Sequence, residues 1–412
     1  MLNWKLNSEV ADSLNKDELT SISETYLQTI NSPEYGFFYL PQNQELVKEA
    51  KRVYEKFKHK KFFIHIGIGG SALGAEMLIK GLGKKDNTEF VIINNIDPDD
   101  LHQKIESIDL KDSLIYVVSK SGTTAETTAA LNIFSELLKA QGISESEFKD
   151  YFVFCTDPKN GDLRALSQEW NTEALDIPAN IGGRFSVLTA VGLFPALFFG
   201  INVQELLDGA KDIGDKLSHP ATSGDFYQLG AFLKTLHDKG FTQTVMMPYS
   251  SLLKEYSAWF TQLWAESLGK EGKGLTPIPA YGATDQHSQV QLFMEGPNDK
   301  VLMLIEVEQF KNDFSLKSTL KGSSSQKLSP YSLSQLMKAE LEGTLAALAE
   351  NSRPVVHLKI KQLDAYHLGQ LILWAECLTV LVGQLLAINP FNQPGVEAGK
   401  KYAFEWLKSS QL

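Results

Sequence analysis

Short apolar runs separated by longer amphipathic stretches dominate the chain between residues 61 and 200. Short apolar runs next to glycine or polar residues are typical of buried strands, and the stretches between them are long enough for helices. Strands that alternate with helices form βαβ units, which build a parallel sheet with helices on both faces. The predicted strands are 62–66, 90–93, 114–118 and 151–155.

A second series of the same kind begins after Ile201. It predicts strands at 244–247, 301–307 and 355–359, with helices between them. We therefore expect an α/β protein with two doubly wound sandwich domains and parallel sheets. The predicted units are a helical N-terminal segment (1–60), a first α/β domain (61–200), a second α/β domain (201–388) and a helical C-terminal segment (389–412).

Composition removes several classes of protein. Hydrophobic residues make up 43% and charged residues 22% of the chain, which is ordinary for a globular protein. The formal net charge is −11, so the chain lacks the positive electrostatic field that nucleic-acid-binding proteins normally have. The two cysteines, Cys155 and Cys377, form no disulfide framework, which suits a reducing cytoplasm. The most apolar stretch, 185–201, is interrupted by Pro195, so we expect a core helix and no membrane span.

A glycine-rich turn, 67–74, directly follows the first predicted strand and opens a helix. Glycines allow close backbone approach to an anion, and a helix N-terminus offers free N–H groups. The turn also satisfies a relaxed dinucleotide fingerprint, although the next strand ends in Asn94-Asn95 and not in an acidic residue. A phosphate site, a dinucleotide site and a purely structural turn all remain open.

A hydroxyl-rich loop follows another predicted strand. Five hydroxyl residues and Lys120 fall within the nine residues 119–127, at a predicted helix start. Hydroxyls and N-terminal N–H groups are suitable donors to a phosphate monoester. The chain has no Walker pattern, so a P-loop nucleotidase is disfavoured. An ordinary helix cap explains one or two of the hydroxyls, and the loop is better explained as a phosphate site.

Two charged residues stand in apolar surroundings. Arg184, one of four arginines, follows Gly182-Gly183 and precedes the apolar stretch. A buried arginine needs a salt-bridge partner or an anion to stabilise. Glu266 lies one helical turn after Gln262 on an aromatic helix, so both share a face. The carboxylate is either a general base or a solvated residue at the helix end.

The eight histidines show no metal-like spacing. His65 and His357 lie inside apolar strands and fit core positions. His287 begins a predicted helix among polar neighbours, which favours an acid/base role.

Lys400 falls on one face of the last predicted helix with Val396 and Phe404. We expect it to point inward, while Lys401 pairs with Glu397 on the outer face. The alternative is a lysine whose ammonium group reaches the surface.

Taken in order, these segments resemble the glucose-6-phosphate isomerase (phosphoglucose isomerase) family from about Lys61 to Lys401. Residues 182–186 and 389–400 carry the most specific part of the resemblance. The resemblance implies two SIS-type α/β domains, a homodimer, and no metal or organic cofactor. It also implies reversible isomerisation of glucose 6-phosphate and fructose 6-phosphate through a cis-enediolate, a step of glycolysis and gluconeogenesis.

The resemblance also implies roles for single residues. Glu266 matches the base that moves a proton between C2 and C1, and Arg184 matches the arginine that stabilises the enediolate. His287, given by the partner subunit, matches the histidine that helps open the sugar ring, and Lys400 matches the lysine at the ring oxygen. The residues matching substrate contacts are Gly70, Ser71, Ser119, Lys120, Ser121, Thr123, Thr124, Gln262 and Gln393.

Three other functions remain open. A related phosphosugar isomerase would also accept mannose 6-phosphate. A phosphosugar-sensing SIS protein would bind without turnover, because one fold serves many functions. A dinucleotide-dependent dehydrogenase is the least favoured of the three. In each isomerase case the anionic substrate is attracted by local charge from Lys120, Arg184 and Lys400, since the net charge is negative.

Overall fold

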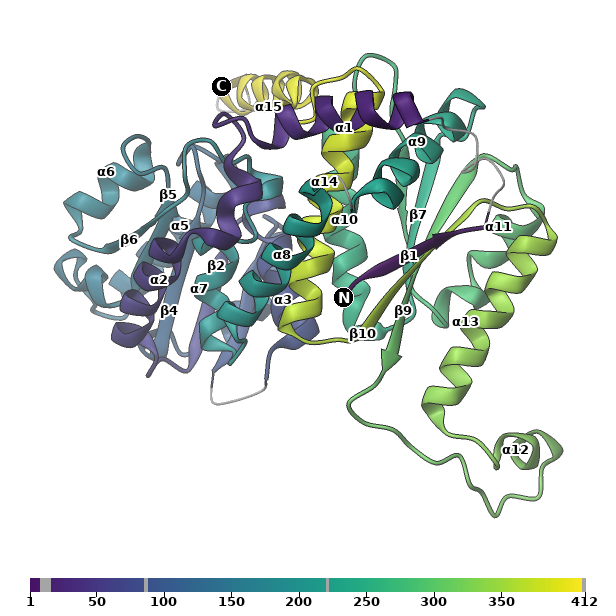
Figure 1. Cartoon of the computed structure of the whole chain (residues 1–412). Coiled ribbons are helices and arrows are strands. Elements are labelled where there is room, and N and C mark those ends of the chain that lie inside the picture. The colour runs from purple at the N-terminus through teal and green to yellow at the C-terminus, as the bar shows by residue number, and fades with distance from the viewer. Residues whose placement is uncertain (8–15, 85–87, 220–221, 410–412) are drawn as a thin grey trace.

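Two five-stranded β-sheets, each between layers of helices, make up the computed structural model, which describes residues 1–7, 16–84, 88–219 and 222–409 (Figure 1). The sheets lie in two units joined by a layer of long helices. The strands of one sheet all fall within residues 61–200, and those of the other come from 243–362 and from the N-terminus.

The first sheet is entirely parallel and has the strand order β3-β2-β4-β5-β6. The apolar runs place its central strands in the core, and all four predicted strands are confirmed. Helices α2 and α7 cover one face, and α4, α5 and α6 cover the other. The strands are β2 (Phe62–Ile66), β3 (Glu89–Ile93), β4 (Ser113–Val118), β5 (Phe152–Thr156) and β6 (Glu173–Asp176); the helices are α2 (Gln44–Phe57), α4 (Pro98–Glu106), α5 (Ala125–Ala140), α6 (Asp162–Glu169) and α7 (Ala190–Phe198).

The second sheet has the order β1-β10-β9-β7-β8, and β1 pairs antiparallel with β10 at its edge. Strand β9 shows how both faces are buried: Met303 packs into one core cluster and its neighbours Leu302 and Leu304 into another. Helices α11 and α13 contribute to the second of these clusters. The elements are β1 (Asn3–Leu6), β7 (Gln243–Pro248), β8 (Thr276–Pro279), β9 (Lys300–Gln309), β10 (Val355–Gln362), α11 (Val290–Glu295) and α13 (Leu333–Glu350).

Three strands of the described chain, β1, β6 and β8, are absent from the predicted set, and each is a four-residue strand at a sheet edge. These three strands are buried less completely than the central ones, and they lack the apolar run that marks a central strand. Strand β8 also contains Pro277 and Pro279, which sheets tolerate at edges. The N-terminal segment, predicted to be helical, therefore also contains a strand that completes the second sheet.

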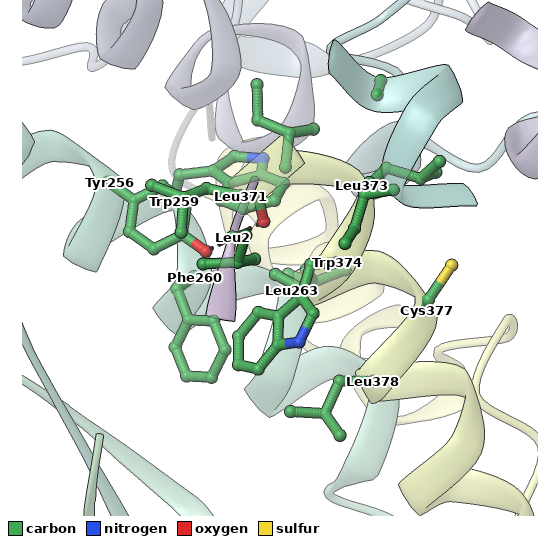
Figure 2. Close-up of a cluster of buried hydrophobic side chains, with 14 of the residues drawn as sticks. Leu2, Tyr256, Trp259, Phe260, Leu263, Leu371, Leu373, Trp374, Cys377 and Leu378 are labelled. Atoms are coloured by element: carbon green, nitrogen blue, oxygen red, sulfur yellow. Dashed lines mark hydrogen bonds between the residues drawn. The ribbon is translucent and has the colours of Figure 1, made fainter. Parts of the chain in front are cut away.

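The largest core cluster lies between the two units, and Figure 2 shows part of it. Trp259 and Leu263 of α10 pack among Leu371 and Trp374 of α14, and the Tyr256 hydroxyl donates to the Leu371 carbonyl at 3.0 Å. The helices around this cluster are α1 (Lys16–Ile30), α3 (Leu73–Leu82), α8 (Val203–Ser218), α9 (Gly224–Asp238), α10 (Lys254–Leu268) and α14 (Ala365–Leu385). Helix α3 of the first unit contributes Met77 and Leu78 to the same cluster, so this packing fixes α10 against the first unit.

In the described chain one helix, α14, is long and apolar enough to cross a bilayer, and 89% of its most apolar window is buried inside the protein. Such burial is what a core helix shows. The stretch 185–201, predicted to be a core helix, is largely buried as well, but only Ala190–Phe198 of it forms a helix, α7.

Two peripheral segments carry exposed apolar side chains. A projecting arm between β9 and α13 contains the short helix α12 (Ser323–Leu328) and exposes Phe314 and Leu320 (Figure 1). The last helix, α15 (Glu397–Ser409), has no buried side chain among its described residues. The expected inward face of α15 is therefore wrong for the single chain, because none of the described residues buries Phe404 or Leu407.

Candidate active site

A cavity of about 750 Å³ lies at the carboxyl ends of β2, β4 and β5, next to α10 and the segment that leads into α15. Ligands of open α/β sheets bind at this edge. Eleven of the thirteen residues predicted for the site line the cavity, namely Gly70, Ser71, Ser119, Lys120, Ser121, Thr124, Arg184, Gln262, Glu266, Gln393 and Lys400. Thr123 and His287 are not among the described residues that line it.

The glycine-rich turn packs so closely against other parts of the site that larger residues would not fit at Gly69 and Gly70. Gly69 has a φ of 57°, and a Cβ there would lie 2.8 Å from Nε2 of Gln262. A Cβ on Gly70 would lie 2.3 Å from the carbonyl carbon of Gly183. The turn thus meets the arginine-bearing loop backbone to backbone. His65 also holds it, with Nε2 of the ring 2.6 Å from the Ser71 carbonyl oxygen.

The hydroxyl-rich loop connects β4 to the N-terminus of α5, where N–H groups are free for an anion. The hydroxyl oxygens of Ser119 and Thr124 lie 3.0 Å apart, and the Gly122 N–H donates to Ser119 at 3.2 Å. Thr123 is exposed and donates to the Ser121 hydroxyl at 3.1 Å. Ser119, Ser121 and Thr124 face the cavity, whereas Thr123 orients Ser121.

Lys120 is held by another loop of the site. Its ammonium donates to the carbonyls of Ala179 and Ile181 at 2.7 and 2.8 Å. Burial lowers the pKa of Lys120, and nearby Asp157 acts in the opposite direction. Lys120 therefore joins the hydroxyl-rich loop to the loop that carries Arg184, and it lies at the cavity wall.

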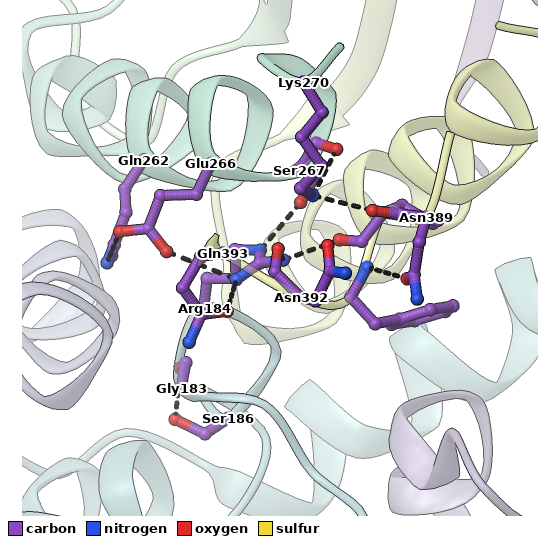
Figure 3. Close-up of polar contacts among 12 residues, drawn as sticks. Gly183, Arg184, Ser186, Gln262, Glu266, Ser267, Lys270, Asn389, Asn392 and Gln393 are labelled. Atoms are coloured by element: carbon purple, nitrogen blue, oxygen red, sulfur yellow. Dashed lines mark hydrogen bonds and ion pairs between the residues drawn. The ribbon is translucent and has the colours of Figure 1, made fainter. Parts of the chain in front are cut away.

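Arg184 is 3% exposed and has five polar contacts within the described chain (Figure 3). Burial lowers the pKa of its guanidinium group, and Glu266 opposes this effect. Its partners are the hydroxyl of Ser267 at 2.8 Å, the carboxylate of Glu266 at 3.2 Å, the side chain of Gln393 at 2.9 Å, and the carbonyls of Pro390 and Asn392 at 2.6 and 3.1 Å.

Glu266 stands in the last turn of α10 and is held from two sides. One carboxylate oxygen accepts from Gln262 Nε2 at 3.0 Å and the other from Arg184 at 3.2 Å (Figure 3). The predicted sharing of a helix face by Gln262 and Glu266 is confirmed. About a third of the Glu266 side chain, 34%, remains exposed, so a substrate in the cavity can reach it. The carboxylate is oriented and accessible, as a general base must be.

Lys400 lines the cavity, but its side chain is 65% exposed. It pairs with Glu397 at 2.9 Å, so the expected pairing of Lys401 with Glu397 is wrong. Residues three apart are neighbours on a helix as residues four apart are, and Lys401 pairs with Glu405.

His287 is exposed and ends the short 3-10 helix Thr284–His287 after β8, outside the cavity of its own chain. The expected helix start at this residue is therefore wrong. The two core histidines follow the prediction better: His65 is buried, and His357 lies 3.0 Å from Glu306.

Three residues of the site were missed by the sequence reasoning. Asp157 follows β5 as Ser119 follows β4, so its position at a strand end was a usable signal. Ser267 and Lys270 come shortly after Glu266, and nothing in their spacing marks them. The contacts that bring them into the site, Ser267 with Arg184 and Lys270 with Asn389, join segments more than eighty residues apart. No group of three or more metal-binding side chains occurs within the described residues.

The family model for phosphoglucose isomerase matches residues 42–292 and 326–411. The chain belongs to the phosphoglucose isomerase family. A glucose-6-phosphate isomerase from Carboxydothermus hydrogenoformans is 37% identical over 422 aligned positions, which cover 95% of this chain and 89% of that protein. The match to the family model includes every segment that forms the cavity.

Two solved structures share the fold of this chain. A hypothetical protein from Thermus thermophilus superimposes with a TM-score of 0.92 at 34% identity and covers 98% of this chain and 100% of its own. A glucose-6-phosphate isomerase from Chlamydia trachomatis has the same fold, with a TM-score of 0.82 at 23% identity, covering 100% of this chain and 89% of that one. The predicted fold of two α/β units is confirmed.

Proposed function

We propose that this chain interconverts glucose 6-phosphate and fructose 6-phosphate, a step of glycolysis and gluconeogenesis. The observation that carries the proposal is the pair of Glu266 and Arg184, 3.2 Å apart, in a cavity that also contains a hydroxyl-rich loop at a helix N-terminus. A base, a cation and an anion-binding loop are the groups that aldose–ketose isomerisation of a sugar phosphate requires.

The phosphate group binds at the hydroxyl-rich loop in this proposal. Ser119, Ser121 and Thr124 offer hydroxyl donors there, and the first turn of α5 adds N–H groups and the positive end of the helix dipole. This group lies away from the reacting carbons, so its binding energy can orient the sugar. Lys120 contributes charge at the wall of the cavity and holds the loop geometry.

Glu266 then removes the proton from C2 and returns it to C1. The Gln262 amide and the Arg184 guanidinium hold its two carboxylate oxygens, which aims the carboxylate. The enediolate formed between these steps carries negative charge on oxygen. Arg184 is already desolvated and fixed by its contacts, so little reorganisation is needed to stabilise that charge. Gln393, held on Arg184 at 2.9 Å, offers a further polar contact to the sugar.

Ring opening needs groups at the ring oxygen and the anomeric hydroxyl. We assign these roles to Lys400 and His287. Lys400 lines the cavity, and its pair with Glu397 is exposed on both sides, so breaking that pair costs little.

His287 lies outside the cavity of its own chain, which supports its delivery by a second copy in a homodimer. The exposed apolar side chains Phe314 and Leu320 on the arm are also consistent with a partner surface. We further propose a cytoplasmic location, which the two buried free cysteines support.

The test is turnover of fructose 6-phosphate by purified protein with excess chelator, with glucose 6-phosphate detected by a coupled dehydrogenase. We expect turnover without added metal or organic cofactor. Binding of the sugar phosphate without turnover would indicate a phosphosugar sensor and not an isomerase. Turnover of mannose 6-phosphate at a similar rate would broaden the substrate class, and tight nicotinamide binding by calorimetry would point to a dehydrogenase.

A further inference from the structure

A tight turn follows the helix that carries Glu266. The backbone N–H of Lys270 donates to the carbonyl of Lys273 at 3.2 Å, and the N–H of Lys273 donates back at 2.8 Å. Glu271 and Gly272, the two residues between them, have φ angles of 54° and 73°. Positive φ at both central positions makes a rigid two-residue turn. The turn therefore holds two lysines in a fixed relation to the end of α10.

Both lysines bind backbone carbonyls of the segment that follows α14. The Lys270 ammonium donates to the carbonyls of Ser267 at 2.8 Å and Asn389 at 2.7 Å (Figure 3). The Lys273 ammonium donates to the carbonyl of Leu386 at 2.8 Å. Hydrogen bonds from a charged donor are about twice as strong as neutral ones. The turn thus ties the end of α10 to a segment more than a hundred residues further along the chain.

The segment bound by Lys270 is the one that encloses Arg184. Pro390 and Asn392 offer their carbonyls to the guanidinium group, and Gln393 offers its side chain. Ser267, whose carbonyl binds Lys270, accepts from Arg184 Nε through its hydroxyl oxygen. Lys270 therefore donates hydrogen bonds to both segments that surround Arg184, the end of α10 and the 389–393 segment. Lys273 donates only to the end of α14.

We propose that Lys270 is a positioning residue that holds the 389–393 segment and Ser267 in place, so that Arg184 is fixed beside Glu266. This inference rests on the proposed function of that pair. Lys270 is half-buried, and nothing in the proposed chemistry requires it to touch substrate. Its role is exerted through Arg184.

The electrostatic surroundings of Lys270 supply a readout that a general loss of stability would not change. Burial lowers the pKa of Lys270 to about 8, with Arg184 acting in the same direction and Glu266 in the opposite one. The 386–393 segment carries no titratable side chain. Above that pKa the ammonium loses its charge and its hydrogen bonds to the two carbonyls weaken. An arginine at this position keeps its charge throughout the range.

The experiment compares Lys270→Met, Lys270→Arg and Lys273→Met in the full-length protein, with thermal melting to confirm folding. We expect Lys270→Met to lower kcat by about 30-fold with KM changed by less than about 2-fold, because the phosphate handle is intact. Lys270→Arg should restore most of kcat, and its rate relative to wild type should rise from about pH 7 to about pH 9.5. Lys273→Met, which removes the same kind of contact, should keep kcat within about 2-fold.

Two results would overturn the inference: a folded Lys270→Met enzyme with wild-type kcat, or equal losses in Lys270→Met and Lys273→Met. A crystal structure of Lys270→Met separates this inference from the proposed function. We expect Arg184 to lose its contacts with Pro390 and Asn392 there and to keep them in Lys273→Met. If wild-type protein shows no turnover, the proposed function fails, and the arginine contacts in the two structures still decide the role of Lys270.

Discussion

Arg184 and Glu266 come from different α/β units, meet at 3.2 Å, and differ sharply in how they are held. The arginine side chain is 2% exposed and the glutamate side chain 34%. The cation is thus fixed in the protein, while the carboxylate faces the cavity. This asymmetry suits a reaction in which the base must move a proton and the cation must only stabilise a charge.

The hydroxyl-rich loop should control affinity more than rate. Ser121→Ala and Thr124→Ala each remove a donor that lines the cavity, and we expect KM for fructose 6-phosphate to rise by about 5- to 10-fold with a smaller change in kcat. Thr128→Ala, on the exposed side of α5, is the matched control and should leave KM unchanged. Steady-state kinetics of the three variants is the measurement. Equal KM values for all of them would place the phosphate elsewhere.

Gly70 and Gly183 meet where the glycine-rich turn packs against the arginine-bearing loop, and substitution by alanine should affect stability differently at the two positions. Gly70→Ala would place a methyl group 2.3 Å from the carbonyl carbon of Gly183, so the two loops must separate. We expect a loss of about 2 kcal/mol in unfolding free energy together with a loss of activity. Gly183→Ala meets nothing within 4 Å and should keep the unfolding free energy within about 0.5 kcal/mol of wild type.

Denaturant titration of both glycine variants makes the comparison. Equal stability of Gly70→Ala and wild type would show that the close approach of the two loops is not tight in solution.

His65 should make stability depend on pH below neutrality. Burial lowers the pKa of His65 to about 4 in the folded protein, from 6.5 for an exposed histidine. The unfolded chain therefore binds a proton as pH falls below about 6.5 while the folded protein does not, so unfolding free energy decreases. From about pH 7 to about pH 5 this amounts to about 2 kcal/mol.

The measurement is denaturant unfolding of wild type, His65→Gln and His102→Gln at both pH values. His65→Gln should lose less stability on acidification, by about 2 kcal/mol, and the variant of the exposed His102 should behave as wild type. If His65→Gln lost as much unfolding free energy on acidification as wild type, His65 would not be a buried neutral histidine in the folded protein.

Much of the architecture could be predicted from the chain. The apolar runs marked every central strand, because a strand buried on both faces needs a nearly continuous apolar sequence. The edge strands β6 and β8 carry no such run and were missed. The site was predictable where residues follow strand ends, as Ser119 does. It was not predictable where a contact joins distant segments, as Lys270 does with Asn389.

The position of Lys400 shows another limit. Its helix has an apolar face in sequence, yet that face is exposed in the single chain. Periodicity predicts that such a face is covered, but it does not say by what.

The proposed delivery of His287 by a partner subunit predicts complementation between inactive variants. Glu266→Gln and His287→Ala are each expected to be nearly inactive alone. Mixing them in equal amounts with subunit exchange gives heterodimers in which one site has both defects and the other has none. Activity should then recover to about a quarter of wild type. If His287 serves its own chain, every site keeps one defect and no activity returns.

In the proposed function, Glu266 moves the proton in a cofactor-free isomerisation. The most direct measurement is turnover of fructose 6-phosphate in excess chelator by wild type, Glu266→Gln and Glu255→Gln, which changes a carboxylate at the other end of the same helix. We predict that wild type and Glu255→Gln convert the substrate and that Glu266→Gln is slower by about 10³-fold while folded. Near-normal turnover by Glu266→Gln would contradict the account.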